Sequence, residues 1–319
     1  MKEDLCAVRE IDRKYRRRNR RKALRRKWPV LLTAVLLPLL AAVCFLVYER
    51  LAKPRAVMPA ADTAVIRILD VGQGDAMLIR TAQHSVLIDA GDRDHGRVLV
   101  QMLRDAGVQR LDCIINSHPH SDHIGGLPAV LDAFPADEIC LPVMPDPLLP
   151  TGTGFQTVLD LAAEKQIPVH TPECGEKRQF DGLTAEFLCV DNTEFENLND
   201  CSLGVRLEYG NVSLLAAGDL EADGESAFAD AGLLRPADIL KVSHHGAVKS
   251  SLISFLEAVS PETAVISCGA FNDYGHPSLK TLKRLHDAGC AVYRTDLDGT
   301  VCIVTDGNQY TVSCGMINP

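Results

Sequence analysis

The chain has 319 residues, of which 46% are apolar, enough for one large hydrophobic core or two small ones. Residues 1–27 carry 13 Lys and Arg against 4 Asp and Glu, a net of +9, so within a whole-chain net charge of −9 the remaining residues carry −18. This acidic body argues against a protein that holds a polyanion by bulk electrostatics, but it leaves open a phosphodiester held at a bound metal.

Residues 28–48 contain no charged side chain, and a helix of that length spans roughly 30 Å, the thickness of a bilayer core. Trp28 and Tyr48 stand at its ends, as in the aromatic belts of membrane helices. We therefore predict a basic cytoplasmic tail (1–27), a single-pass anchor in the cell membrane (28–48), a linker (49–63) and an extracytoplasmic catalytic domain (64–319). A cleaved signal peptide is the alternative.

From residue 64 onward, apolar periodicity and Gly and Pro signals predict the secondary structure. In the first half we expect strands at 64–70, 76–80, 85–89, 112–116 and 167–170, helices at 98–106, 124–134 and 154–166, and a proline-rich loop at 138–150. In the second half we expect strands at 180–190, 203–217 (with a turn at 209–211), 238–243, 263–267, 291–294, 300–304 and 310–313, and helices at 221–231, 251–259 and 278–288. Strands in both halves with helices between them predict an α/β fold in which helices cover two packed sheets, an αββα sandwich.

Residues 117–126 read Ser-His-Pro-His-Ser-Asp-His-Ile-Gly-Gly and follow a short apolar run. Imidazole and carboxylate groups bind borderline-soft divalent metals such as zinc. A tight loop can point alternate side chains at one spot, so His118 and His120 could face one metal while Asp122 and His123 face a second. The alternative is a polar loop that happens to hold histidines.

This H-x-H-x-D-H string is the signature of the metallo-β-lactamase superfamily, and five further motifs narrow the resemblance. They are Leu-Asp-Val-Gly-Gln-Gly-Asp at 69–75, Leu-Ile-Asp-Ala-Gly at 87–91, Ala-Gly-Asp at 217–219, Lys-Val-Ser-His-His-Gly at 241–246 and Asn-Asp-Tyr-Gly-His-Pro at 272–277. From about residue 65 to 312 the chain resembles the metallo-hydrolase domain of ComEC-type DNA-uptake proteins and its stand-alone relatives. The resemblance implies a metallo-β-lactamase αββα sandwich with hydrolase activity.

The resemblance also implies metal ligands beyond this loop. Asp219, in a Gly-Asp pair at a strand end, would bridge both metals, whereas an isolated Gly-Asp is an ordinary turn. His244 and His245 follow a strand, and adjacent strand residues point to opposite faces. One of these two histidines should therefore reach the metal while the other makes contacts around it, and we favour His244 as the ligand.

Further polar residues are expected around the metals. In the resembled subfamily Asn199 and Ser202 stand where many relatives carry another histidine ligand, and we expect both to contact the substrate. His170 is expected to be an ordinary solvated side chain. His276 could protonate a leaving group or bind a phosphate oxygen, unless it is merely exposed before a helix N-cap. Additional candidates are Ser250 and Ser251, for an anionic substrate at a helix N-terminus, and Asp75 and Asp89, as carboxylates that orient histidines or form turns.

These features predict metal-assisted hydrolysis, with Asp122, Asp219 and His276 as catalytic residues. Two divalent ions, Zn²⁺ or alternatively Mn²⁺, would lower the pKa of bound water. By resemblance the substrate is a phosphodiester such as DNA, which makes the protein a membrane-anchored nuclease or phosphodiesterase. The alternatives are a hydrolase of an ester, lactone or lactam, and a non-catalytic accessory module of a DNA-uptake or envelope system.

Overall fold

The computed structural model describes residues 36, 38–40, 42–43, 59–150, 152–192 and 194–315. The predicted basic tail and most of the predicted anchor and linker lie outside these residues. The structure contradicts the predicted single-pass localisation in the cell membrane, because in the part of the chain that it describes no helix is long and apolar enough to cross a bilayer.

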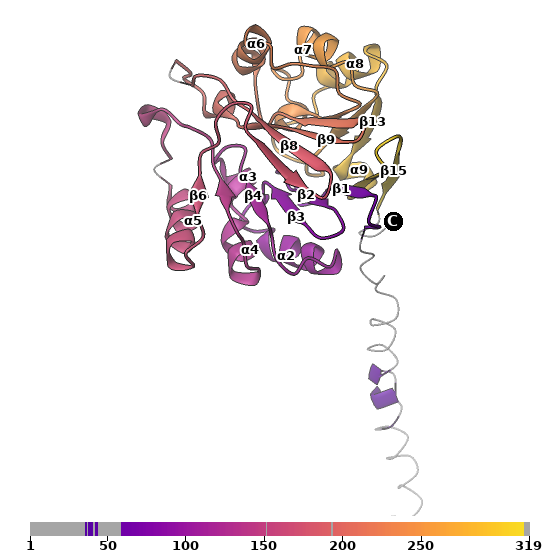
Figure 1. Cartoon of the computed structure of the whole chain (residues 1–319). Coiled ribbons are helices and arrows are strands. Elements are labelled where there is room, and N and C mark those ends of the chain that lie inside the picture. The colour runs from indigo at the N-terminus through magenta and orange to yellow at the C-terminus, as the bar shows by residue number, and fades with distance from the viewer. Residues whose placement is uncertain are drawn as a thin grey trace, which may run out of the picture. The chain divides into compact units, whose positions relative to one another are not determined.

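The described strands form two sheets, which are packed face to face (Figure 1). The first sheet has eight strands, in the spatial order β15 (Tyr310–Cys314), β14 (Val301–Thr305), β1 (Ala64–Ile68), β2 (Met77–Arg80), β3 (Ser85–Ile88), β4 (Cys113–Ile115), β5 (Ile139–Cys140) and β6 (Val169–His170). The strands pair antiparallel from β15 to β3 and parallel from β3 to β6.

The second sheet has seven strands, in the order β13 (Ala291–Arg294), β12 (Thr263–Ile266), β11 (Ile239–Lys241), β10 (Val212–Ala216), β9 (Gly204–Tyr209), β8 (Leu183–Leu188) and β7 (Lys177–Phe180). Strands β10 to β13 are parallel, whereas β7 to β10 are antiparallel. The carboxyl ends of parallel strands share one sheet edge, so the loops after β10, β11 and β12 emerge side by side there. These three loops carry Asp219, the His244-His245 pair and His276.

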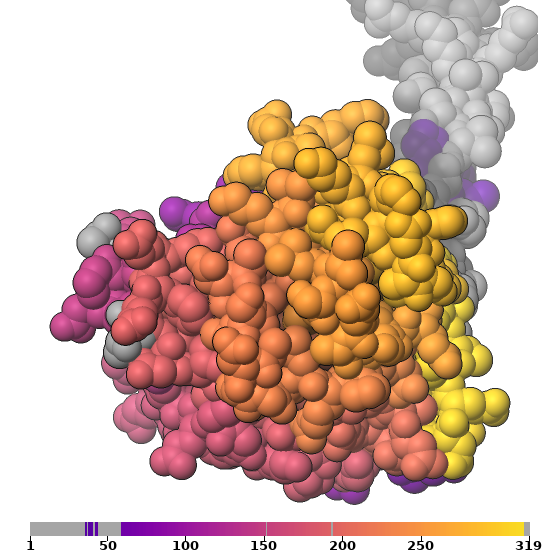
Figure 2. Space-filling model, turned by 90° about the horizontal axis from the view of Figure 1, so that it is seen from above, coloured from indigo at the N-terminus to yellow at the C-terminus, as the bar shows by residue number. Residues whose placement is uncertain are grey.

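Helices cover the outer face of each sheet, so the predicted αββα sandwich is confirmed. Helices α2 (Gly96–Asp105), α4 (Leu127–Ala133) and α5 (Thr153–Glu164) lie on the first sheet, and α6 (Ala222–Asp230), α7 (Ile253–Val259) and α8 (Leu279–Asp287) lie on the second (Figure 1). The orange residues of this second helical layer fill the centre of the face seen in Figure 2. Short helical segments complete the fold: α3 (Ser121–Ile124), α9 (Thr295–Asp298), and the 3₁₀ turns η1 (Asp146–Leu148), η2 (Leu198–Cys201) and η3 (Ser243–Gly246).

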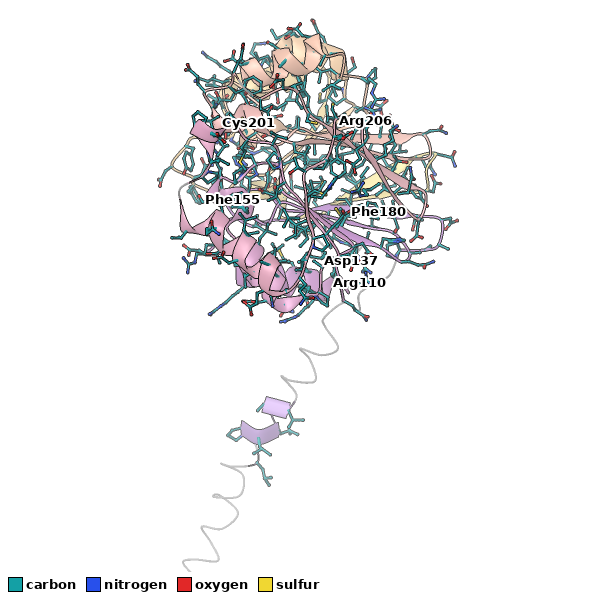
Figure 3. The ribbon with its side chains drawn as sticks, turned by 60° about the vertical axis from the view of Figure 1, so that its left-hand side comes forward. Arg110, Asp137, Phe155, Phe180, Cys201 and Arg206 are labelled. Atoms are coloured by element: carbon teal, nitrogen blue, oxygen red, sulfur yellow. The ribbon has the colours of Figure 1, made fainter. Side chains whose placement is uncertain are left out.

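The largest buried apolar cluster lies between the two sheets. Ile66, Ile79 and Val86 of the first sheet pack there against Phe187 and Val205 of the second. Alternation along each strand explains this arrangement, because every second side chain points inward while the others face the helices. Phe180 lies in this middle layer, whereas the ion-paired Arg110 and Asp137 lie at the lower side of the two-sheet body in Figure 3.

Two predicted elements are each divided in the structure. The predicted helix 124–134 is split into α3 and α4 at Gly126, because the Gly126 N–H donates to the carbonyl of Gly91 (3.0 Å) and not within a helix. The predicted strand 180–190 is a hairpin of β7 and β8, because Asp181 (φ 49°) and Gly182 (φ 85°) form a two-residue left-handed turn. An Asp-Gly pair is a common signal for such a turn, and it could have been used in the sequence analysis.

Candidate metal centre

Asp89 anchors the histidine-rich loop that follows β4. Its Oδ1 accepts hydrogen bonds from the side-chain amide of Asn116 (2.8 Å) and the backbone N–H of Ser117 (2.8 Å). Its Oδ2 accepts a hydrogen bond from the hydroxyl of Ser117 (2.6 Å) and lies 2.9 Å from Nδ1 of His123. A carboxylate on Nδ1 fixes the ring so that Nε2 is the nitrogen left for a metal. The contact places Asp89 in the orienting position expected from the sequence.

His118 and His120 turn ring nitrogens toward each other, with 3.0 Å between His118 Nε2 and His120 Nδ1. The opposite nitrogen of His118, Nδ1, lies 3.1 Å from the hydroxyl of Ser117. Burial, reinforced by the neighbouring His123, holds the pKa of His118 well below its usual value. His118 is therefore neutral at pH 7, which is the form of imidazole that binds a cation.

Four further predicted ligands come together from three separate loops. Asp122 Oδ2 lies 3.2 Å from His245 Nε2, and Asp219 Oδ2 lies 3.2 Å from His123 Nε2 and 3.5 Å from His245 Nε2. Burial alone would raise the pKa of Asp219, but His123 and His245 outweigh it and hold that pKa well below its usual value. The Asp219 carboxylate, almost fully buried, is therefore ionised beside two imidazoles.

The Asp219 carboxylate is positioned by the turn after β10. Gly218 has φ +57°, and a Cβ atom on it would lie 2.6 Å from Ser202 Oγ and 2.9 Å from Ser117 Cβ, so only glycine fits. The backbone N–H of Asp219 donates to Ser202 Oγ (3.1 Å), and the Ser202 hydroxyl donates to the carbonyl of Asn199 (2.7 Å). Ser202 is buried and holds Asp219 in place, rather than facing a substrate as expected.

Asp75 forms a buried ion pair with Lys241 that joins the two halves of the fold. The Lys241 Nζ–Asp75 Oδ2 distance is 2.5 Å, and both side chains are almost fully buried. Asp75 Oδ1 also lies 3.4 Å from Nδ1 of His245, and the carbonyl of Ser267 lies 2.9 Å from the same nitrogen. The Ser267 carbonyl thus orients His245, with the Asp75 carboxylate beside it, much as Asp89 orients His123.

The preference for His244 over His245 as metal ligand is not supported. His245 is buried, with Nε2 directed at Asp122 and Asp219, whereas His244 Nε2 lies 3.8 Å from Asp219 Oδ2 and its Nδ1 lies 3.2 Å from Glu221 Oε1. The rule of alternating faces fails because both histidines lie in a turn, with φ of 50° and 53°, and not in an extended strand.

Glu221 is a site residue that the sequence analysis missed, although it follows the Asp219 motif by only two positions. Besides His244, it receives a hydrogen bond from the side-chain amide of Asn199 (3.4 Å). Asn199 is buried, and besides this contact its Oδ1 atom has no hydrogen-bond partner among the described residues. His170 pairs with Glu176 (3.0 Å) and belongs to none of the metal-ligand groups found among the described residues.

His276 lies beside the histidine pair. Its ring centroid is 5.4 Å from that of His244 and 6.1 Å from that of His245, and Tyr274 stacks on it at 5.7 Å. Burial and the two neighbouring histidines lower the pKa of His276 to about 4. Ser278 caps helix α8 by accepting the N–H of Thr281 (3.1 Å), but this cap does not place His276 in solvent, because its ring adjoins the site.

Ser250 and Ser251 do not form the predicted anion site. Both are fully buried, and the N–H groups of Ser251 and Leu252 already donate to the carboxylate of Glu225, a residue of α6. Burial raises the pKa of Glu225 to about 7. The helix N-terminus is therefore occupied by a protein carboxyl group, which the sequence analysis could not foresee because Glu225 lies in another helix.

The cluster fits divalent cations. Among the described residues, the groups whose ligand atoms lie within 4.8 Å of one another include His118, His123 and Asp219, and Asp122, His123 and His245. Within the described residues, the buried atoms His123 Nε2 and Asp219 Oδ1 have no hydrogen-bond partner. Buried polar atoms are normally satisfied, so such orphaned donors and acceptors are expected at metal sites. Carboxylates gathered with imidazoles are also the donor set that zinc prefers.

Comparison with known proteins agrees with this geometry. The chain is similar to ComE operon protein 3 of Bacillus subtilis (strain 168), at 30% identity over 260 residues, 74% of this chain and 32% of that protein. It is also similar to Competence protein ComA of Neisseria gonorrhoeae, at 33% identity over 243 residues, 75% of this chain and 32% of that protein. The chain thus spans about a third of the length of these relatives.

Among solved structures, the metallo-β-lactamase fold protein YhfI of Bacillus subtilis matches with a TM-score of 0.50 and 13% identity, over 72% of this chain and 95% of that one, which shows a common fold alone. A family model described as Metallo-beta-lactamase superfamily matches residues 69–270. The chain therefore belongs to the metallo-β-lactamase superfamily, generally metal-dependent hydrolases, and has competence proteins of the ComEC type among its relatives, as its motifs indicated.

Proposed function

We propose that this chain is a metal-dependent phosphodiesterase that acts on nucleic acid. The observation that carries the proposal is the convergence of Asp122, His123, Asp219 and His245 in one cluster, with nitrogen–oxygen distances of 3.2 to 3.5 Å and His276 beside it. The names of two relatives, Competence protein ComA and Recombination protein 2 of Haemophilus influenzae, favour nucleic acid as the substrate. Recombination protein 2 is 30% identical over 264 residues.

The residues divide into two ligand sets that share Asp219. His118 and His120 would hold one cation and Asp122, His123 and His245 the other, with Asp219 between them. When bound, two divalent ions, Zn²⁺ or Mn²⁺, would polarise a phosphoryl oxygen and activate a water molecule. Asp89 occupies Nδ1 of His123, and the Ser267 carbonyl, with Asp75 beside it, occupies Nδ1 of His245, which leaves both Nε2 atoms to bind cations.

His276 is placed to contact the substrate directly. Its buried Nδ1 has no hydrogen-bond partner among the described residues. The backbone around it is fixed by Asn272, whose Oδ1 accepts the N–H of His276 (3.0 Å) and whose Nδ2 donates to its carbonyl (2.6 Å). A fixed imidazole with a free nitrogen suits a hydrogen bond to a phosphoryl or leaving-group oxygen.

The test uses the full chain, stripped of metal with a chelator and reloaded with Mn²⁺ or Zn²⁺. Hydrolysis of bis-p-nitrophenyl phosphate, single-stranded DNA and double-stranded DNA is compared in the wild type, Asp219→Ala and His170→Ala. We expect metal-dependent cleavage in the wild type and in His170→Ala, whose imidazole lies outside the cluster, and a loss of at least about 100-fold in Asp219→Ala.

Two outcomes would contradict the proposal. The first is reloaded protein that holds metal but cleaves no phosphodiester. A parallel assay with ester, lactone and lactam substrates would then show whether another hydrolase activity is present. Phosphodiester cleavage that persists in Asp219→Ala would place the activity outside this site.

A further inference from the structure

The loop between β12 and α8, residues 267–278, holds two exposed aromatic rings and also carries His276, which adjoins the candidate metal centre. Phe271 is fully exposed, at 103% relative accessibility, and Tyr274 is 71% exposed. Tyr274 stacks on His276 with ring planes 22° apart, and the His276 ring adjoins His244 and His245. The aromatic pair therefore lies on the same loop as the residue that adjoins the metal ligands.

This loop is tied down at both ends. Near its start, the N–H of Gly269 donates to Gln73 Oε1 (3.1 Å), and Asn272 Nδ2 donates to the carbonyl of Gly269 (2.9 Å). At its end, the N–H of Ser278 donates to the carbonyl of Gly246 (2.9 Å). The exposure of the two rings is thus set by a hydrogen-bonded loop.

The conformation of Phe271 is unfavourable on two counts. A phenylalanine in water forgoes the burial that its ring would otherwise gain. Its backbone is also left-handed, with φ of 57°, a region that bulky residues seldom adopt. Uncommon backbone conformations of this kind are concentrated at ligand-binding sites, where the surrounding structure enforces them.

The charge of the chain indicates what such rings would bind. Because residues 28–319 carry a net charge of −18, a nucleic acid gains little from bulk electrostatic attraction to this body. Stacking of bases on aromatic side chains is an uncharged and sequence-tolerant source of affinity for single strands. In a duplex the bases are already stacked on one another, so their faces are not available to such rings.

We propose that Phe271 and Tyr274 form a base-stacking platform that binds single-stranded nucleic acid and presents the adjoining phosphodiester to the metal centre. This inference rests on the proposed function for the nature of the substrate and adds the preference for single strands. Phe271 and Tyr274 are substrate-binding residues in this scheme, and they take no part in the bond-breaking step.

The test measures binding without turnover. The full chain, kept metal-free with chelator at low ionic strength, is titrated against a fluorescently labelled 12-nucleotide oligothymidylate and an abasic strand of the same length and charge. We expect the wild type to bind oligothymidylate about tenfold more tightly than the abasic strand. Phe271→Ala and Tyr274→Ala should each lose most of this preference, and the double variant should bind both strands equally.

Val169→Ala is the matched control, because Val169 is an exposed apolar residue (44%) on β6, at the far edge of the other sheet. It should keep the wild-type preference, and thermal unfolding should show that all variants are folded. Failure of the wild type to bind oligothymidylate, equal binding of both strands, or a preference that survives in the double variant would overturn the inference. Equal binding of the two strands would favour a protein, rather than a nucleic acid, as the partner that contacts the two rings.

Adding Mn²⁺ separates this inference from the proposed function. If the reloaded wild type cleaves the abasic strand as efficiently as oligothymidylate, the phosphodiesterase proposal stands and the stacking platform is wrong. If the wild type shows the base preference in binding but cleaves neither strand, the platform stands and the proposed chemistry is wrong.

Discussion

Substituting Gly218 by alanine tests whether the turn before Asp219 builds the metal centre. A non-glycine residue in the left-handed region costs about 1–2 kcal/mol. The new Cβ atom would also lie 2.6 Å from Ser202 Oγ and 2.9 Å from Ser117 Cβ, and overpacking of this kind costs about 1–3 kcal/mol. We therefore expect Gly218→Ala to lower the free energy of unfolding by about 2–5 kcal/mol.

The matched control is Gly232→Ala. Gly232 has φ +69°, but a Cβ atom there would have no heavy atom within 4 Å, so this substitution carries the conformational cost alone. Both substitutions also lower the conformational entropy of the unfolded chain by the same amount, so this contribution to the free energy of unfolding cancels in the comparison. Urea unfolding of both variants should therefore differ by the overpacking cost, about 1–3 kcal/mol.

Metal content is the second measurement. The displaced turn would move the Asp219 N–H away from Ser202 Oγ, its partner at 3.1 Å, and carry the carboxylate with it. After reloading and dialysis, Gly218→Ala should hold less metal than Gly232→Ala. Equal unfolding free energies for the two variants, or wild-type metal content in Gly218→Ala, would refute the reasoning.

Three further predictions follow from buried charges. Lys241→Met should destabilise the chain by about 3–5 kcal/mol, because it leaves the Asp75 carboxylate buried without its ion-pair partner. In urea unfolding, the double variant with Asp75→Asn should recover part of this loss. No recovery would contradict a direct ion pair. The pKa of Glu225 is raised to about 7, so between about pH 4.5 and 7 the unfolded chain releases this proton first and stability falls by up to about 3 kcal/mol. Glu225→Gln should lack this part of the pH dependence, and identical slopes in the two proteins would disprove it. Asp219→Ala should retain less metal than His170→Ala when both are reloaded and measured by elemental analysis, and equal content would remove Asp219 from the ligand set.

Much of the fold was predictable because its signals are local. Apolar alternation marks each strand, and glycine and proline mark the turns, so the order of strands and helices and the two-sheet arrangement follow from the sequence. The errors occur where distant backbone intervenes. Gly126 divides a predicted helix because its N–H donates to the carbonyl of Gly91, far away in the chain.

The candidate site likewise has one part that local sequence predicts and another that depends on distant contacts. His118, His120, Asp122 and His123 lie within six consecutive positions after one strand, so their proximity is a property of the chain itself. Asp219 was placed beside them only by resemblance to a family motif. Its position depends on Ser202, 17 residues earlier in the sequence, which accepts the Asp219 N–H.

What the sequence by itself determined is the superfamily, the αββα architecture and the ligand-bearing loop, because contiguous residues specify them. What only the tertiary structure decided is which histidine faces the cluster and which polar groups are already satisfied. His245 takes the inner position because the turn is left-handed and Asp75, from the other half of the fold, meets its ring. Ser250 and Ser251 do not form an anion site, because Glu225, 25 residues before Ser250, already accepts the N–H groups of Ser251 and Leu252 that precede helix α7. Contacts of this kind join residues far apart in the chain, and no local pattern encodes them.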